Sequence, residues 1–142
     1  MVACTFFGHR IVAEPIENKL YSIIEELIIE ENVDTFYVGC KGAFDELVLK
    51  TLIELKSKYS HINYAVVLAY HPSRYKNALG FISIYPEELE GTISKFAIDK
   101  RNRWMIEKST YVISYIVKEN SCADKYRRLA ERKGVIVFNI AN

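Results

Sequence analysis

The 142-residue sequence has few of the features that mark several large classes of protein. Its three cysteines, Cys4, Cys40 and Cys122, lie far apart and in no CxxC spacing, which argues against a disulfide framework and a structural zinc site. No apolar run approaches the roughly 20 residues that a membrane helix needs, and residues 1–5 do not begin a signal peptide. We therefore expect a cytoplasmic protein with reduced thiols and no membrane partner.

A strong charge of one sign is also missing. Lys and Arg number 19 against 18 for Asp and Glu, which leaves a formal net charge of +1. Such a chain has no bulk field that would attract duplex nucleic acid, so any anionic ligand must be held by local groups. Hydrophobic residues make up 50% of the chain, which is enough for a core with helices on both faces of a sheet, and the length predicts one domain over residues 1–142.

The stretch from residue 33 to residue 51 organises the rest of the chain. An apolar run at 35–38 ends in a turn that contains Gly39 and Gly42, and a helical pattern follows from residue 43. Two glycines three positions apart allow a sharp turn and a close approach to a ligand, while the first turn of the helix directs unpaired N–H groups at the same point. The pattern predicts an anion site, although tight strand-to-helix turns also use glycine for steric reasons alone.

Apolar periodicity predicts the order of the elements along the chain. Strands are expected at 3–7, 35–38, 62–70, 111–117 and 135–140, and helices at 16–31, 43–56, 94–109 and 121–133. Residues 75–92 have no sustained period, and we expect an irregular connection there. The alternation indicates right-handed crossovers, so we predict a single-domain α/β fold with a doubly wound, mainly parallel five-stranded sheet and helices on both faces, a Rossmann-like arrangement.

In such sheets, ligands bind beyond the carboxyl ends of the strands, at the point where the strand order reverses. The loops at 8–10, 39–42 and 117–121 are expected to converge there. Arg10 follows the first strand directly, and its planar guanidinium suits a phosphate or a carboxylate. Asp45 falls in the first turn of the second helix, where the helix dipole favours a carboxylate whatever its function. The same carboxylate is also suited to bind a ribose hydroxyl or orient a water, and the two roles are compatible.

Three stretches carry a family resemblance. They are CTFFGHR at 4–10, GCKGAFD at 39–45 and RNRWMI at 101–106, and together they resemble the YpsA-like branch of the SLOG (SMF/DprA-LOG) superfamily of Rossmann-like proteins. The resemblance spans nearly the whole chain and implies binding or processing of nucleotides and nucleotide-derived ligands. Some relatives cleave the N-glycosidic bonds of nucleotides, and others bind single-stranded DNA. Relatives commonly carry a second glycine-rich turn after the fourth strand, where this chain has KENSCA at 118–123.

The loops and the motifs together define the predicted ligand-binding residues. These are Gly8, His9, Arg10, Gly39, Cys40, Lys41, Gly42, Asp45, Arg101, Arg103, Asn120 and Ser121, with no metal among the ligands. His9 either contacts the ligand or fixes its own turn, and Cys40 beside Lys41 has surroundings that favour a thiolate. Because Arg101 and Arg103 are two positions apart on a helix, at most one of them is expected to reach the site. Trp104 and Met105 are expected in the core.

The sequence therefore predicts a protein that binds a nucleotide or a nucleotide-derived small molecule at the carboxyl edge of the sheet and does not bind duplex nucleic acid. Two alternatives stay open. One is an N-glycosidase or transferase acting on nucleotides, which needs a carboxylate at the sugar, and Asp45 and Glu119 are the carboxylates on these loops. The other is a protein-interaction module that presents Tyr75, Phe81 and Tyr85. The ligand, any cofactor, any reaction and self-association are left open.

Overall fold

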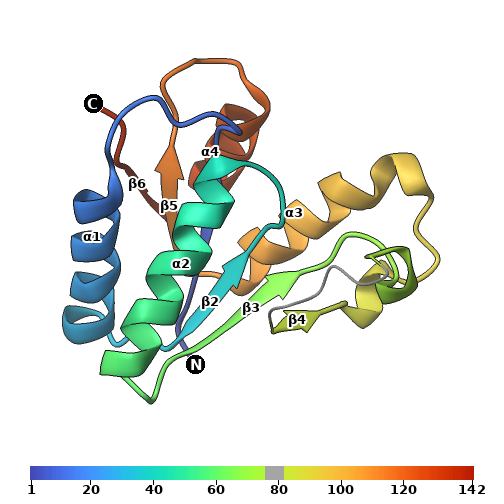
Figure 1. The fold of residues 1–142 in the computed structure, drawn as a ribbon. Helices are drawn as coiled ribbons and strands as arrows, with labels where there is room; N and C mark the ends of the chain where they lie inside the picture. Colours follow the sequence, from blue (N-terminus) through green and yellow to red (C-terminus); the bar gives the residue numbers. More distant parts are fainter. Residues whose placement is uncertain (76–81) are drawn as a thin grey trace.

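A computed structural model describes residues 1–75 and 82–142 of the chain. Strands and helices alternate, and all the strands form one parallel sheet in the order β4-β3-β2-β1-β5-β6 (Figure 1). The strands are β1 (Ala3–Gly8), β2 (Thr35–Val38), β3 (Asn63–Val67), β4 (Ser83–Ile84), β5 (Tyr111–Tyr115) and β6 (Ile136–Asn139). The α-helices are α1 (Glu17–Glu30), α2 (Ala43–Lys58), α3 (Ala97–Lys108) and α4 (Cys122–Arg132). Three short 3-10 helices are η1 (Pro72–Tyr75), η2 (Glu87–Leu89) and η3 (Ser94–Phe96).

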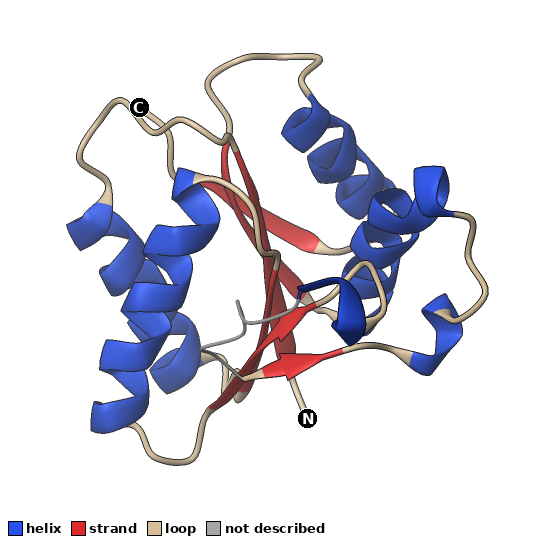
Figure 2. Cartoon of the chain, turned by 45° about the vertical axis from the view of Figure 1, so that its right-hand side comes forward, coloured by secondary structure: helices blue, strands red, loops and turns tan. Residues whose placement is uncertain are grey.

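The first strand lies at the centre of the sheet, and the chain winds outward from it in both directions. Residue Cys4 of β1 is opposite Phe36 of β2 on one side and opposite Tyr111 of β5 on the other. The order reverses between β1 and β5, which is the position where parallel sheets of this kind bind ligands. Figure 2 shows the sheet edge-on between two layers of helices, with α1 and α2 on one face and α3 and α4 on the other.

Alternation along the strands builds a core on each face of the sheet. Phe6 packs into the core under α1 and α2, and the next residue, Phe7, packs into the core under α3 and α4. The inner strands β1 and β5 are buried along almost their whole length, because both of their faces are covered by helices. Met105 is fully buried, as predicted, and the half-buried Trp104 packs edge-to-face on Tyr37.

The structure corrects the predicted number of strands from five to six. The segment expected to be irregular begins at the last residue of η1 and contains η2 and the two-residue strand β4, which pairs with Val66 and Val67 of β3. Two residues are too few to produce a readable alternation, so no pattern marked this strand. Phe81 of the predicted interaction surface lies outside the described residues, as does Gly80.

Candidate functional site

A cavity of about 370 Å³ lies at the carboxyl ends of β1 and β2, between the first turns of α2 and α4 and beside α3. Its position is the one predicted from the topology of the sheet. Both polar and apolar side chains border it, and its volume falls in the range of small-molecule sites. Its lining consists of Phe6, Phe7, Gly8, His9, Arg10, Gly39, Lys41, Asp45, Ile98, Arg101, Asn102, Met105, Ser121, Cys122, Ala123 and Tyr126.

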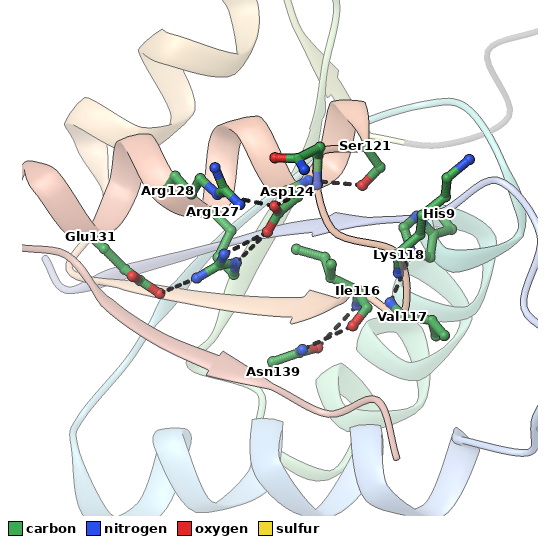
Figure 3. A network of polar contacts seen from close by, with 11 residues as sticks. His9, Ile116, Val117, Lys118, Ser121, Asp124, Arg127, Arg128, Glu131 and Asn139 are labelled. Carbon is green, nitrogen blue, oxygen red and sulfur yellow. Dashed lines mark hydrogen bonds and ion pairs between the residues drawn. The ribbon is translucent and has the colours of Figure 1, made fainter.

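His9 holds two loops of the site together. Its Nε2 accepts hydrogen bonds from the backbone N–H groups of Val117, at 2.9 Å, and Lys118, at 3.2 Å (Figure 3). A ring nitrogen that accepts carries no hydrogen, so the hydrogen-bond network places the N–H of this ring on Nδ1. The sequence left open whether this histidine fixes a turn or meets a ligand. The structure shows that it fixes the loop after β5 and also borders the cavity.

The backbone of Arg10, and not the predicted anion, lies against Gly42. Its φ of 98° is in the left-handed region, and a Cβ there would lie 2.7 Å from the Cα of Arg10. The N–H of Ala43 donates to the Arg10 carbonyl at 2.8 Å, so the loop after β1 occupies the start of α2. Gly42 does not line the cavity. Gly42 lets the loop after β1 pack closely against the start of α2. We predicted that it faces a bound anion, but the backbone of Arg10 lies at that position.

Gly39, in contrast, faces the charged groups of the cavity. A Cβ on this residue would lie 2.8 Å from Oδ2 of Asp45 and 3.7 Å from Nη1 of Arg101. The absence of a side chain on Gly39 therefore leaves room for a carboxyl group and a guanidinium group at the end of β2. The backbone N–H of Lys41 donates to the same Asp45 oxygen at 3.2 Å.

Asp45 is half-buried in the wall of the cavity. Loss of hydration raises the pKa of its carboxyl group to about 6, although the Lys41 N–H and the nearby Arg101 guanidinium both favour the charged form. A carboxyl group with a pKa near neutrality inside a cavity is typical of groups that exchange protons in function.

Arg101 is the most buried cation of the site, with 7% of its surface exposed. Its Nη1 donates to the carbonyl of Val67 at 2.9 Å, and its Nε donates to Oδ1 of Asn102 at 2.8 Å. Within residues 1–75 and 82–142, it forms no ion pair with a carboxylate, and Nη2 has no acceptor. Buried charges are usually paired with an opposite charge, and this guanidinium lacks such an ion-pair partner among the described residues.

The first turn of α4 forms the opposite wall. Ser121 caps the helix, since its Oγ accepts from the N–H of Asp124 (Figure 3). The Asp124 carboxylate in turn accepts from the N–H of Asn120. The arrangement is close to a capping box, except that the aspartate accepts from the residue before the N-cap. It stands where the family resemblance implied a second glycine-rich turn. Cys122 and Ala123 line the cavity, and their backbone N–H groups have no acceptor in the described part of the chain.

Asp124 itself is completely buried and points away from the cavity. The Asn120 N–H and the Arg127 guanidinium hold the pKa of this carboxyl below its usual value, against the cost of burial. Arg127 and Arg128 both pair with it, as Figure 3 shows. The Asp124 carboxylate neutralises Arg127 and Arg128 on the outer side of the α4 N-terminus. The cavity side of this terminus, at Cys122 and Ala123, carries no such carboxylate contact in the described residues.

Most of the predicted site residues line the cavity, namely Gly8, His9, Arg10, Gly39, Lys41, Asp45, Arg101 and Ser121. Four others do not. Cys40 and Gly42 lie in the turn behind the cavity wall, and Asn120 contributes its N–H to the cap of α4. Arg103 lies on an exposed face of α3, where it pairs with Asp99 at 2.9 Å. The two-residue spacing separated the arginines as expected, and the structure shows that Arg101 is the inward one.

The sequence did not point to Asn102, Tyr126 or the backbone of Cys122 and Ala123 as parts of this cavity. Tyr126 stacks on Phe7 and donates to Asp99 at 2.8 Å, and burial and this carboxylate raise its pKa to about 12. These residues come from α3 and α4, whose orientation over the sheet is a tertiary property. In the described ranges, no group of His, Cys, Asp or Glu residues could hold a metal ion, and no helix is long and apolar enough to cross a membrane.

No family model matches the sequence, and no curated protein matches it. Among solved structures, DNA processing protein A (DprA) from Streptococcus pneumoniae is similar, with a TM-score of 0.67 and 18% sequence identity. The chain has a Rossmann-like fold of the DprA type. The alignment covers 97% of this chain and 50% of the DprA chain, so the protein spans about half the length of that structure. At this identity the similarity with DprA shows the fold alone, and it confirms the predicted fold class.

Proposed function

We propose that the protein binds a nucleotide or a nucleotide-derived small molecule in the cavity at the carboxyl ends of β1 and β2. The observation that carries this proposal is Arg101, a buried guanidinium on the cavity wall that forms no ion pair with a carboxylate of the described residues. A ligand phosphate would supply the missing negative charge and could accept from Nη2.

Other groups of the cavity support an anionic ligand with hydroxyl groups. Arg10 and Lys41 add exposed cations at the rim, and the N–H groups of Cys122 and Ala123 add donors at the positive end of α4. The Asp45 carboxylate is suited to accept from a sugar hydroxyl. This combination of donors for phosphate and an acceptor for ribose favours a nucleotide over inorganic phosphate.

The family relationship is part of the same proposal. The motifs at 4–10, 39–45 and 101–106 and the DprA-type fold both support membership of the SLOG superfamily, and the motifs support its YpsA-like branch. The structural relative is a DNA-processing protein. Single-stranded oligonucleotides therefore belong in the ligand panel beside mononucleotides.

A second candidate function is cleavage or transfer at the N-glycosidic bond of a nucleotide. Asp45 favours it, because a carboxyl group with a pKa of about 6 can exchange a proton near neutral pH. Glu119, the other carboxylate considered, borders a different hollow and does not line the cavity. The test is release of free base from nucleoside monophosphates by the wild type and by Asp45→Asn.

The interaction-module hypothesis receives less support from the described aromatic residues. The Tyr75 hydroxyl accepts from the N–H of Tyr70, and the Tyr85 hydroxyl donates to the carbonyl of Leu89. Both side chains are half-buried and stabilise their own loops.

The binding proposal is tested with a thermal-shift panel of nucleotides, nucleoside phosphates, dinucleotides and short single-stranded DNA. Native mass spectrometry of freshly purified protein would reveal a ligand that copurifies. Arg10→Ala removes a cation from the cavity rim, and Arg103→Ala removes another exposed arginine from a different face of the molecule. A compound that stabilises the wild type should lose its effect on Arg10→Ala and keep it on Arg103→Ala. Equal responses of both variants, or no response to any compound, would overturn the proposal.

A further inference from the structure

Strand β6 forms one edge of the sheet, and the helices cover it less well than the inner strands (Figure 1). Ile136 is 48% exposed and Phe138 is 37% exposed. The Phe138 ring stacks on Tyr111 with centroids 6.3 Å apart, and Tyr111 belongs to the core under α1 and α2. Ile136 and Phe138 alternate with Val137, which packs on the core of the other face. The face of β6 on the side of α1 and α2 is therefore both apolar and exposed.

The backbone of β6 carries unused hydrogen-bonding groups along its outer side. The N–H groups of Ile136 and Ile140 donate toward β5, at 3.1 Å and 2.8 Å. Because alternate residues of a paired strand face opposite sides, Val137 and Asn139 direct their N–H and C=O groups away from β5. Within residues 1–75 and 82–142, no backbone group of another element bonds to these outward groups.

This edge lacks the features that keep edge strands from pairing with another chain. Such features are a lysine or a proline in the strand, a bulge, or a very short strand. At the opposite edge, β4 has two residues. In contrast, β6 has four residues in continuous register with β5, and residues 134–142 contain no proline and no charged side chain. The edge is therefore suited to pair with a further strand.

The composition of β6 favours a second copy of the same strand as that partner. In an antiparallel pair centred on Val137, the N–H and C=O groups of this residue pair with those of the same residue in the copy. The Asn139 N–H then meets the outward carbonyl of Val135. On the exposed face, Ile136 lies opposite Phe138 of the copy, and such aromatic–aliphatic cross-strand pairs stabilise sheets. An uncharged strand brings no like charge against its copy, whereas a charged partner strand would find no counter-charge here.

We propose that the chain forms a two-fold symmetric homodimer in which the β6 strands of two copies pair antiparallel and join the two sheets into one. This inference does not depend on the proposed function. Because the paired strands run in opposite directions, the carboxyl edges of the two sheets face opposite ways. The candidate site of each copy stays open, so dimerisation and ligand binding can be tested separately.

Gel filtration coupled to light scattering, on the full chain from low to high micromolar concentration, tests the proposal. The mass of the wild type should rise toward twice the 16.4 kDa of one chain. Ile136→Lys should weaken dimerisation about tenfold or more, because it places two lysines near the symmetry axis and removes the apolar pairs. Ile53→Lys makes the same change at a similarly exposed isoleucine of α2 and should dimerise like the wild type. Circular dichroism checks that both variants fold.

Amide hydrogen exchange of the wild type is a second measurement, which needs no substitution. The N–H groups of Val137 and Asn139 should exchange more slowly at high than at low protein concentration. Those of Ile136 and Ile140, which donate toward β5, should be protected at both concentrations. The proposal is overturned by a single-chain mass at the highest concentration, by a dimer that Ile136→Lys leaves intact, or by exchange of Val137 and Asn139 that does not depend on concentration.

Discussion

Two aspartates show how residue environment sets opposite responses to pH. Asp45 is desolvated in the cavity wall, and its pKa is raised to about 6. Asp124 is buried among donors and arginines, and its pKa is lowered. The folded protein therefore binds a proton on Asp45 more tightly than the unfolded chain does, and binds one on Asp124 less tightly.

We predict that Asp45→Asn stabilises the protein at neutral pH. The contribution of Asp45 to stability is fully present below its unfolded pKa of 3.8 and is lost as the pH rises through about 6, because the folded state then carries a desolvated charge. Replacing it with a neutral amide should raise the free energy of unfolding at pH 7.5 by roughly 1–3 kcal/mol and change it little at pH 4. Urea denaturation at the two pH values measures this. Glu54→Gln, an exposed glutamate further along α2, is the control, and an equal effect of Asp45→Asn at both pH values would contradict the prediction.

Gly42 permits a second prediction at the residue scale. Gly42 and Gly134 both have a positive φ, but a Cβ on Gly134 meets open space whereas a Cβ on Gly42 meets the backbone of Arg10. Gly134→Ala should therefore cost about 1 kcal/mol from backbone strain alone. Gly42→Ala should cost more than about 2 kcal/mol, because the loop after β1 must also move. Chemical denaturation of both variants compares the costs, and equal values would show that the close approach is unimportant.

At the scale of elements, the start of α4 is stabilised by a cap and a charge cluster that belong together. Ser121→Ala should cost about 1 kcal/mol, the usual loss for an N-cap side chain. Asp124→Ala should cost more, since it removes the acceptor for Asn120 and leaves Arg127 and Arg128 without their shared partner. Thermal unfolding of the wild type and both variants measures the two losses of stability. A larger loss for Ser121→Ala than for Asp124→Ala would contradict the prediction.

The same cluster predicts how α4 responds to acid. The stability that comes from Asp124 is present above its unfolded pKa and is lost as the pH falls through its lower folded pKa. The wild type should therefore lose stability in acid, and Asp124→Asn should lose less over the same range. Unfolding free energies measured from pH 6 downward test this, and parallel curves for the two proteins would count against it.

At the scale of the whole molecule, burial should decide the reactivity of the thiols. Cys4 is fully buried in the core and its pKa is raised by burial, Cys40 is half-buried, and Cys122 is exposed. A thiol-specific reagent should modify Cys122 first in the native protein and should reach Cys4 only after unfolding. Mass spectrometry of partly labelled protein identifies the order. Rapid labelling of Cys4 under native conditions would show that the central strand opens easily.

The near-balance of charge predicts weak binding to duplex DNA. With a net charge of +1, the protein has cations gathered at one cavity and no excess to neutralise a row of phosphates. Fluorescence anisotropy with random duplex DNA at moderate salt should show little binding. Tight binding with a steep dependence on salt would contradict the assignment of a small ligand.

The sequence by itself determined the fold class, because periodicity is a local property of the chain. Apolar strands and amphipathic helices in strict alternation lead to a parallel sheet, and the sheet places the loops after β1, β2 and β5 at one edge. The tertiary structure decided what those loops do. It turned Arg101 inward and Arg103 outward, set the Arg10 backbone against Gly42, and added β4. These features depend on contacts between residues far apart in the chain, which no local pattern records.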